Sequence, residues 1–266
     1  MNRLLLALAL VLCVAGTSFA SGYLGPAEPI APVGKFSFGV GYFYYDDQFK
    51  KSGIQNDLHQ NQLYLEGSWG FAKGWEGYLR LGGADARFTN ADNDFNFNDT
   101  MKFYTGVGVR GVLYRFSPQF SLGTNLYVDY IWQAFKDTQQ ASTYITSNNQ
   151  TYLLQAEATT KASNMWSGTA AFYGQWTPVK EVVVYGGPKF YYQQFKADIT
   201  AGSASLNGTG VPVDLGDSET MTGKSWIGGV LGAGITVPQT NNRLKFGVEW
   251  QFSTRSSIGG QISYAF

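Results

Sequence analysis

The sequence predicts an all-β fold, a closed antiparallel transmembrane β-barrel of about ten strands. Ten segments carry apolar residues at every second position, which is the period at which side chains alternate between the two faces of a strand. Short turns and long polar loops alternate between these segments, as in membrane barrels with an even number of strands. The composition, with 14% charged residues, 16% aromatic residues and 33 glycines, is unusual for a soluble domain and suits a wall that faces lipid. The long region 135–164 leaves eight or twelve strands as alternatives.

Each predicted strand has about the length that a tilted membrane strand requires. In the first, residues 35–45, Phe36 and Phe38 point to one face while Ser37 and Gly39 point to the other. Pro188 interrupts the seventh strand, because proline removes a donor from the hydrogen-bond ladder. Helical periodicity is absent throughout. Five of the other predicted strands cover residues 62–71, 102–116, 224–237, 244–252 and 256–266. Three more begin at residues 75, 119 and 182, and one ends at residue 176.

The connections between these strands differ in length on the two sides. Those around Lys73, Pro118, Pro178 and Thr240 are short and carry Gly, Pro or Asn, the residues typical of turns. The intervening connections are polar, and four of them are long. These long loops are predicted at residues 46–61, 88–101, 135–164 and 196–223.

One long connection has structure of its own. Segments 142–146 and 151–155 flank a polar tip at residues 147–150. This pattern predicts that the fifth and sixth strands run beyond the membrane as one long hairpin. A short helical turn over residues 156–163 is the alternative.

The last eleven residues alternate to the very end of the sequence. Ile258, Gly260, Ile262, Tyr264 and Phe266 lie on one face, and the final residue is aromatic. This ending resembles the closing strand of bacterial outer-membrane β-barrels, the class of OmpA-like and small porin-like barrels. The resemblance implies that the chain lies in the outer membrane of a Gram-negative cell envelope, with its short turns on the periplasmic side. It also implies that the last strand pairs with the first, that the assembly machinery recognises this strand, and that membrane lipid and lipopolysaccharide surround the barrel.

The N-terminus has the layout of a cleaved secretory signal peptide. A positive head ending at Arg3 precedes an apolar run, and small residues lead to a predicted cleavage after Ala20. An uncleaved anchor is disfavoured because the run is short for a spanning helix. Cleavage of residues 1–20 would remove Cys13, the only cysteine, and with it any disulfide or cysteine metal site. Residues 21–34 contain three prolines and are predicted to form a periplasmic linker before the barrel at 35–266.

Charged residues gather on the predicted inner face of the strands. Charge facing lipid costs several kcal/mol near mid-membrane, whereas charge in the lumen can be paired and hydrated. The interior of a barrel of about ten strands is largely filled by side chains, which favours a salt-bridged interior over a narrow charge-lined pore for small solutes or a catalytic cluster. The interior set comprises Glu66, Glu76, Arg80, Arg110, Asp129, Lys189, Lys245 and Glu249.

Large aromatic residues near the ends of the outer face are predicted to form interfacial girdles. The net charge of zero, with no basic arm or stripe, gives no electrostatic basis for nucleic-acid binding. The main girdle residues are Trp69, Trp75, Trp132, Trp176 and Phe266.

Catalytic and metal-binding patterns are weak. The only histidine, His59, lies near Asp57, but no second acidic pair of the omptin-protease kind and no His-x-Ser pattern of lipid A-modifying enzymes accompanies it. Asp92, Asp94 and Asp99 could supply oxygen ligands to calcium, although the glycine and closing glutamate of an EF-hand are missing. No cofactor motif is found.

The sequence therefore predicts a non-enzymatic outer-membrane barrel with a structural or surface-interaction role and at most a narrow pore. The alternatives are a small-solute porin and, less favoured, an omptin-like or lipid A-modifying enzyme.

Overall fold

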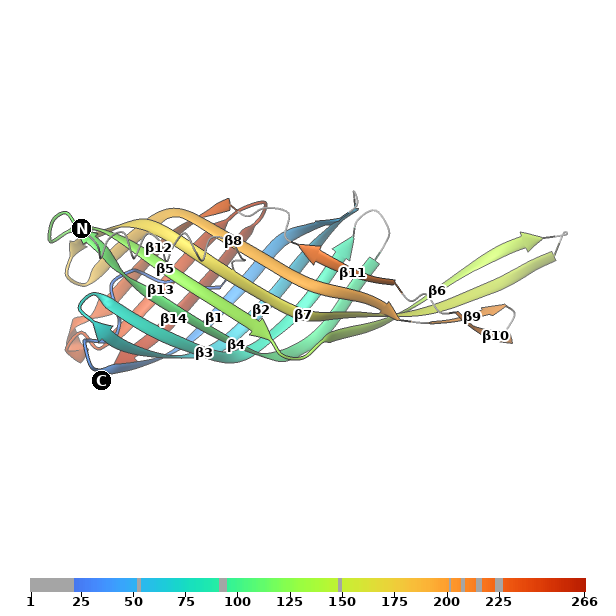
Figure 1. Cartoon of the computed structure of the whole chain (residues 1–266), viewed down its shortest axis with the longest axis horizontal. Helices are drawn as coiled ribbons and strands as arrows, with labels where there is room; N and C mark the ends of the chain where they lie inside the picture. The colour runs from blue at the N-terminus through green and yellow to red at the C-terminus, as the bar shows by residue number, and fades with distance from the viewer. Residues whose placement is uncertain are drawn as a thin grey trace, which may run out of the picture.

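The structure is a computed structural model that describes residues 22–51, 54–90, 95–147, 150–200, 202–206, 209–213, 217–222 and 227–266. Ten antiparallel strands close into a barrel (Figure 1), which confirms the predicted fold class and strand number. The circle closes through the pairing of β1 with β14 and of β7 with β8. Within the described residues, no helix is both long and apolar enough to cross a membrane. The wall strands are β1 (Phe36–Lys51), β2 (Ile54–Ala72), β3 (Trp75–Asn90), β4 (Phe95–Arg115), β5 (Phe120–Ile131), β7 (Gln150–Val179), β8 (Val182–Thr200), β12 (Ile227–Val237), β13 (Leu244–Phe252) and β14 (Ser256–Ala265).

The short turns and the C-terminus lie together at one end of the barrel (Figure 1). Gly74 supplies a positive φ of 79° to the β2–β3 turn, a conformation that glycine adopts without steric cost. A single 3-10 turn, Pro238–Thr240, joins β12 to β13 and is followed by Asn241 in the left-handed region. These turns match the positions predicted from the Gly, Pro and Asn residues.

A β-sheet extension projects from the opposite end (Figure 1). The hairpin predicted there is confirmed: β6 (Phe135–Ser147) pairs with the outer part of β7 from Phe135↔Ala162 to Ser147↔Gln150. Residues 156–163 lie within β7, so the alternative of a helical turn is wrong. The β8–β12 connection adds three short strands, β9 (Gly202–Leu206), β10 (Thr209–Val213) and β11 (Asp217–Thr222).

Several segments predicted as loops are strand instead. Pairing of β1 with β2 continues to Lys51↔Ile54, and β3 pairs with β4 as far as Asn90↔Phe95. Residues 46–51, 54–61, 88–90 and 95–101 therefore belong to the wall and its rim rather than to loops. The prediction ended each strand where apolar alternation ended, but a β-ladder is made by backbone groups and continues through polar residues.

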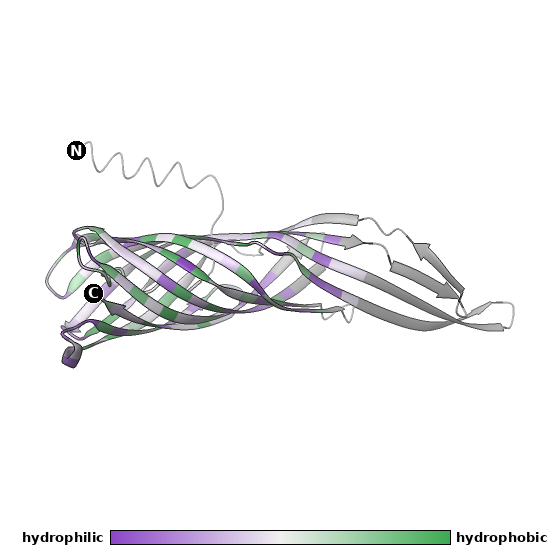
Figure 2. Ribbon diagram, turned by 90° about the horizontal axis from the view of Figure 1, so that it is seen from below, coloured by the Kyte–Doolittle hydropathy of each residue, from purple (hydrophilic) through white to green (hydrophobic). Residues whose placement is uncertain are grey.

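The strand register turns apolar residues outward and polar residues inward. Phe38, Leu65 and Val107 are each about 60% exposed, whereas Glu66 is buried directly after Leu65. Figure 2 shows hydrophobic residues recurring along the strands of the barrel. Apolar side chains outside and polar ones inside are the arrangement that a bilayer requires of a barrel.

The aromatic residues predicted to form girdles lie mainly on this outer surface. Trp69, Trp132, Trp176 and Phe266 are exposed, and Trp176 stacks on Phe120 with ring centroids 6.1 Å apart. Trp75 is half-buried. Contact of these rings with the membrane interface stays a prediction.

The C-terminal strand forms the predicted seam with the first strand. The register runs from Ser37↔Ala265 to Tyr44↔Ile258, and the Phe266 N–H donates a hydrogen bond of 3.0 Å to the Phe36 carbonyl. The Phe266 ring meets Phe38 edge-on, with centroids 5.8 Å apart. Because β1 and β14 pair along this length, neither strand leaves a free edge there.

Candidate functional site

Residues 22–31 occupy the lumen of the barrel, and residues 32–34 are exposed where the segment leaves it; residues 22–34 are called the plug below. They form neither helix nor strand apart from one bridge, Val33↔Gly70. Leu24 and Ala27 are 0% exposed, and the inward-facing side chains of the wall surround them. The segment was predicted to be a periplasmic linker, and for the described residues that location is wrong. Its prolines rule out regular secondary structure. They give no sign that wall side chains form hydrogen bonds with the N–H and C=O groups of this segment.

Two wall carboxylates hold the plug by its backbone amides. Glu249 accepts hydrogen bonds from the Leu24 and Gly25 N–H groups at 3.0 and 2.9 Å. Glu76 accepts hydrogen bonds from the Ile30 and Ala31 N–H groups at 2.9 and 2.8 Å. Two successive amides that converge on one anion form a nest, and Gly25, with φ at 76°, has the left-handed conformation that such a nest uses.

The plug carbonyls are also satisfied by the wall. The Leu24 carbonyl accepts hydrogen bonds from Asn125 and Arg110, and the Gly25 carbonyl accepts one from the Tyr173 hydroxyl. Further along the plug, Lys245 Nζ donates to the Pro29 carbonyl at 3.0 Å. Buried backbone groups need such partners, so these contacts make the plug part of the folded barrel.

Two arginines and two glutamates form a buried ion network beside the plug. Arg80 binds Glu66 at 2.6 Å, and Arg110 binds both Glu66 at 2.8 Å and Glu76 at 2.5 Å. The register produces these pairs, because Glu66 lies opposite Arg80 and Glu76 lies opposite Arg110 on neighbouring strands. The rings of three tyrosines lie within 4.9 Å of the Arg80 guanidinium carbon, which adds cation–π contacts. They are Tyr64, Tyr78 and Tyr127.

The structure thus brings together four of the eight predicted interior charges. Glu249 and Lys245 bind the plug instead of each other, and Lys189 Nζ donates to the Gln251 side chain at 2.6 Å. Asp129 accepts a hydrogen bond from the Ser167 hydroxyl, and no ion pair reaches it from the described residues. All eight side chains face the lumen as strand parity predicts, but the plug is a partner of four of them, namely Glu76, Arg110, Lys245 and Glu249.

Gln251 is a site residue that the charge pattern did not identify. Its amide nitrogen donates to the Gly22 carbonyl at 2.7 Å and to Glu249 at 2.6 Å, while its oxygen accepts from Lys189. Gln251 follows Glu249 by two residues, so both side chains lie on the inner face of the strand. This spacing is the one feature of the sequence from which the position of Gln251 in the lumen could have been predicted.

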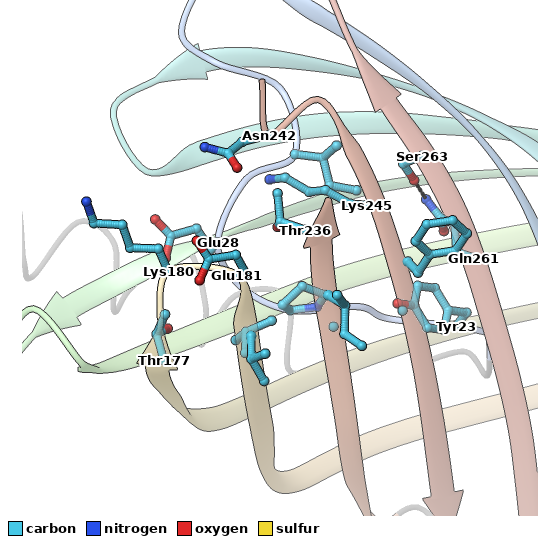
Figure 3. A pocket seen from close by; sticks show the side chains of 18 residues that line it. Tyr23, Glu28, Thr177, Lys180, Glu181, Thr236, Asn242, Lys245, Gln261 and Ser263 are labelled. Atoms are coloured by element: carbon cyan, nitrogen blue, oxygen red, sulfur yellow. Dashed lines mark hydrogen bonds between the residues drawn. The ribbon is translucent and has the colours of Figure 1, made fainter. Parts of the chain in front are cut away.

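Cavities lie at the short-turn end, where the plug leaves the lumen. One, of about 240 Å³, separates the plug from the wall formed by β8, β12, β13 and β14. Figure 3 shows Lys180, Glu28 and Glu181 close together at its mouth, with Tyr23 beside Gln261 farther in. A second cavity of about 750 Å³ lies at the foot of the plug, between Pro32, Lys73 and Arg243.

The outer half of the lumen is filled differently, by an apolar cluster. Phe88 packs against Phe97 and Phe195, with ring centroids 5.3 and 4.9 Å apart. Phe43 and Phe135 are fully buried in the same cluster. The described lumen is therefore occupied at two levels, by the plug with its ion network and by this apolar cluster.

His59 lies at the rim in an arrangement that differs from the predicted one. Its Nδ1 is 3.4 Å from Asp46 and 3.2 Å from the Tyr44 hydroxyl, while Asp57 pairs with Arg255 at 2.5 Å. No serine or threonine hydroxyl among the described residues is hydrogen-bonded to His59. The absence of enzymatic activity remains a prediction.

The carboxylate of Asp99, one of the three calcium candidates, accepts hydrogen bonds from one lysine ammonium and two backbone N–H groups. Partial burial raises the pKa of its carboxyl, and hydrogen bonds from the Lys136 N–H, Lys102 Nζ and the Thr100 N–H outweigh that effect and lower the pKa. Asp92 and Asp94 lie outside the described residues. No group of three acidic, histidine or cysteine side chains is placed to hold a metal within the described ranges.

A prediction tests how the plug is seated against β5. A valine at Gly123 would overlap the Ala27 side chain, so Gly123→Val should displace the plug. Overpacking of this kind typically costs about 1–3 kcal/mol, which corresponds to a rise of roughly 5- to 150-fold in the displaced population. The measurement is the rate of maleimide labelling in a Leu24→Cys background, because Leu24 is 0% exposed while the plug is in place. Gly174→Val is the matched control, because a Cβ there meets open space; equal rates in the two variants would contradict the described seat.

No protein-family model matches the chain, and no curated protein matches it either. Among solved structures it is similar to an outer membrane channel from Pseudomonas putida F1, with 11% identity, a TM-score of 0.45, and coverage of 92% of this chain and 100% of the other. It is also similar to the translocator domain of the autotransporter NalP from Neisseria meningitidis, with 12% identity, a TM-score of 0.42, and coverage of 88% and 89%. The CymD monoaromatic hydrocarbon channel shows 10% identity and a TM-score of 0.40, with 94% of each chain covered. Similarities at this level assign no family and carry no argument about function.

Proposed function

We propose that this protein is exported with a cleaved signal peptide and forms a non-enzymatic barrel in the outer membrane, with a lumen that its own N-terminal segment closes. Its role is structural or one of surface interaction, and solute passage is at most that of a narrow pore. The observation that carries the proposal is the plug, because two carboxylate nests and the Glu66–Arg80–Arg110–Glu76 network fix it across the lumen. A filled and hydrogen-bonded interior is rigid, and we expect it to be closed to solutes.

The β6–β7 hairpin supports an interaction role. It extends beyond the rim that the other wall strands reach, at the end opposite the C-terminus (Figure 1). A strand pair that stands clear of the membrane surface offers backbone edges and side chains to a partner outside the cell. Lipopolysaccharide is the nearest candidate surface for this interaction.

A small-solute channel is the second candidate function. The plug lacks regular secondary structure, and a cavity of about 750 Å³ lies at its foot. The wall holds residues 22–31 through side chains, and only the end of the plug is bonded to the wall backbone, at Gly70. Residues 22–31 can therefore leave the lumen without unfolding the wall, and their departure would uncover the charged interior.

Single-channel recording in planar bilayers separates these two functions. The folded full-length protein, selected by its heat-modifiable migration in detergent gels, is expected to give no stable openings. Stable openings of uniform size in the unmodified protein would overturn the closed-barrel proposal and favour the channel.

A further inference from the structure

The cavity of about 750 Å³ at the foot of the plug is strongly basic. Five basic side chains from separate parts of the wall line it, and within the described residues Glu28 is the one acidic side chain of its lining. Even with the C-terminal carboxylate of Phe266 added, cations outnumber anions by five to two. Cations gathered around one concavity repel one another and attract anions into it. The five are Lys35 before β1, Lys73 in the β2–β3 turn, Arg115 at the end of β4, and Arg243 and Lys245 at the start of β13, called the basic vestibule below.

Three cations of the basic vestibule have no acidic partner. Lys35, Lys73 and Arg243 are exposed, and none of them forms an ion pair with a described residue. A single exposed lysine needs no partner, because water solvates its ammonium group. Three such cations that line one cavity together with two more form a place where one anion can meet several positive charges at once.

The plug already places one carboxylate in the basic vestibule. Glu28 accepts hydrogen bonds from Arg115 Nη2 at 3.2 Å and from Gln175 Nε2 at 3.3 Å. Lys245 Nζ donates to the next carbonyl of the plug, that of Pro29, at 3.0 Å. Because the Glu28 side chain is 46% exposed and its pair with Arg115 is a surface pair, another anion can replace it on Arg115 at small cost and without unfolding the wall.

We propose that the basic vestibule binds a soluble anion with two or more carboxylate or phosphate groups, and that this anion displaces Glu28 from Arg115. The cavity has the size of sites that hold small molecules, and a guanidinium matches the geometry of both kinds of group. Glu28 has the advantage of being tethered to its site, but it meets one cation of the basic vestibule; an anion that meets several offsets that advantage. This inference goes beyond the proposed function and rests on it only for the compartment, the periplasm, from which the anion would come.

Isothermal titration calorimetry of the folded full-length protein in non-ionic detergent tests the site, with citrate and pyrophosphate as the probes. Both should bind saturably, and more weakly as sodium chloride is raised, because salt screens exposed charges. The double variant Lys73→Met, Arg243→Met should bind about tenfold more weakly, since each exposed charge contact contributes roughly two- to fivefold. Arg87→Met is the matched control: it removes an exposed cation at the opposite end of the barrel and should leave the affinity unchanged. All variants are first checked for folding by heat-modifiable migration.

The displacement of Glu28 has a readout of its own. Glu28→Gln removes the competing charge, so both probes should bind about two- to fivefold more tightly. Glu181→Gln makes the same change at the same end, but Glu181 lines the smaller cavity and not the basic vestibule, so its effect should be much less. Equal gains in the two variants would show a general field instead of exchange on Arg115, and would overturn the inference.

Two further results would also overturn it. One is the absence of saturable binding of either probe. The other is binding of dihexanoyl phosphatidylglycerol in preference to both probes, which would assign these cations to lipid headgroups. Calorimetry in detergent involves neither conduction nor the direction of insertion, so a negative result leaves the closed-barrel proposal standing. Conversely, stable openings in planar bilayers would overturn that proposal and leave anion binding intact.

Discussion

Arg110→Met is expected to destabilise the folded barrel by about 3–5 kcal/mol, because it removes one partner from a buried ion network and leaves the others uncompensated. Arg110 binds Glu66, Glu76 and the Leu24 carbonyl, so both the wall and the plug lose a donor. Glu66 would keep its pair with Arg80, whereas Glu76 would keep only the hydrogen bonds from the Ile30 and Ala31 N–H groups. The measurement is the free energy of unfolding in urea, followed by tryptophan fluorescence in detergent.

Arg115→Met is the matched control for this experiment. Arg115 makes the same kind of pair, with Glu28 at 3.2 Å, but its side chain is 48% exposed at the mouth of the barrel. Exposed ion pairs contribute about 0–1 kcal/mol to stability, so the free energy of unfolding of this variant should be close to that of the unmodified protein. Similar losses in the two variants would show that the interior network contributes no more than a surface pair.

Val107→Arg is expected to lower the free energy of unfolding of the barrel by about 2–4 kcal/mol, which is the penalty for a cation on the lipid face near mid-membrane. Val107 lies on the outer face between Phe103 and Leu113, and its neighbours across the sheet are Leu79 and Val128. An arginine there has no acidic partner and would have to reach the membrane interface along the wall.

Val179→Arg controls for the chemical change. Val179 is also exposed, but it ends β7 beside a short turn, where the penalty falls to about 0–1 kcal/mol. The comparison is made by unfolding in lipid vesicles, because detergent adapts to the altered surface. Equal penalties at the two positions would contradict the membrane depth that the outer face implies.

The wall of the barrel could be predicted because lipid and lumen impose opposite requirements on alternate residues. Strand parity sorted Val107 to the outside and Arg110 to the inside, and the same rule placed all eight interior charges. The predicted strand ends were less accurate, because polar residues such as Asp57 continue the ladder through their backbone alone.

The plug could not be predicted because nothing in residues 22–34 repeats with the period of a strand or helix. Its partners are also invisible in the pattern. Glu76 pairs with Arg110, which fits the predicted salt-bridged interior, but Glu76 and Glu249 each also bind two backbone amides of the plug. A backbone N–H is present in almost every residue, so no sequence signal marks the amides that a carboxylate will select.

The length of β7 has a mechanical consequence. This strand of 30 residues runs from the short-turn end into the extension, bonded to β6 in the extension and to β5 and β8 in the wall, with an irregularity at Asn164 where the register with β8 shifts. A pull on the tip of the hairpin therefore acts along the strand, where many hydrogen bonds lie perpendicular to the force and resist it together. A load on the hairpin would therefore be shared between the β5–β7 and β7–β8 ladders of the wall.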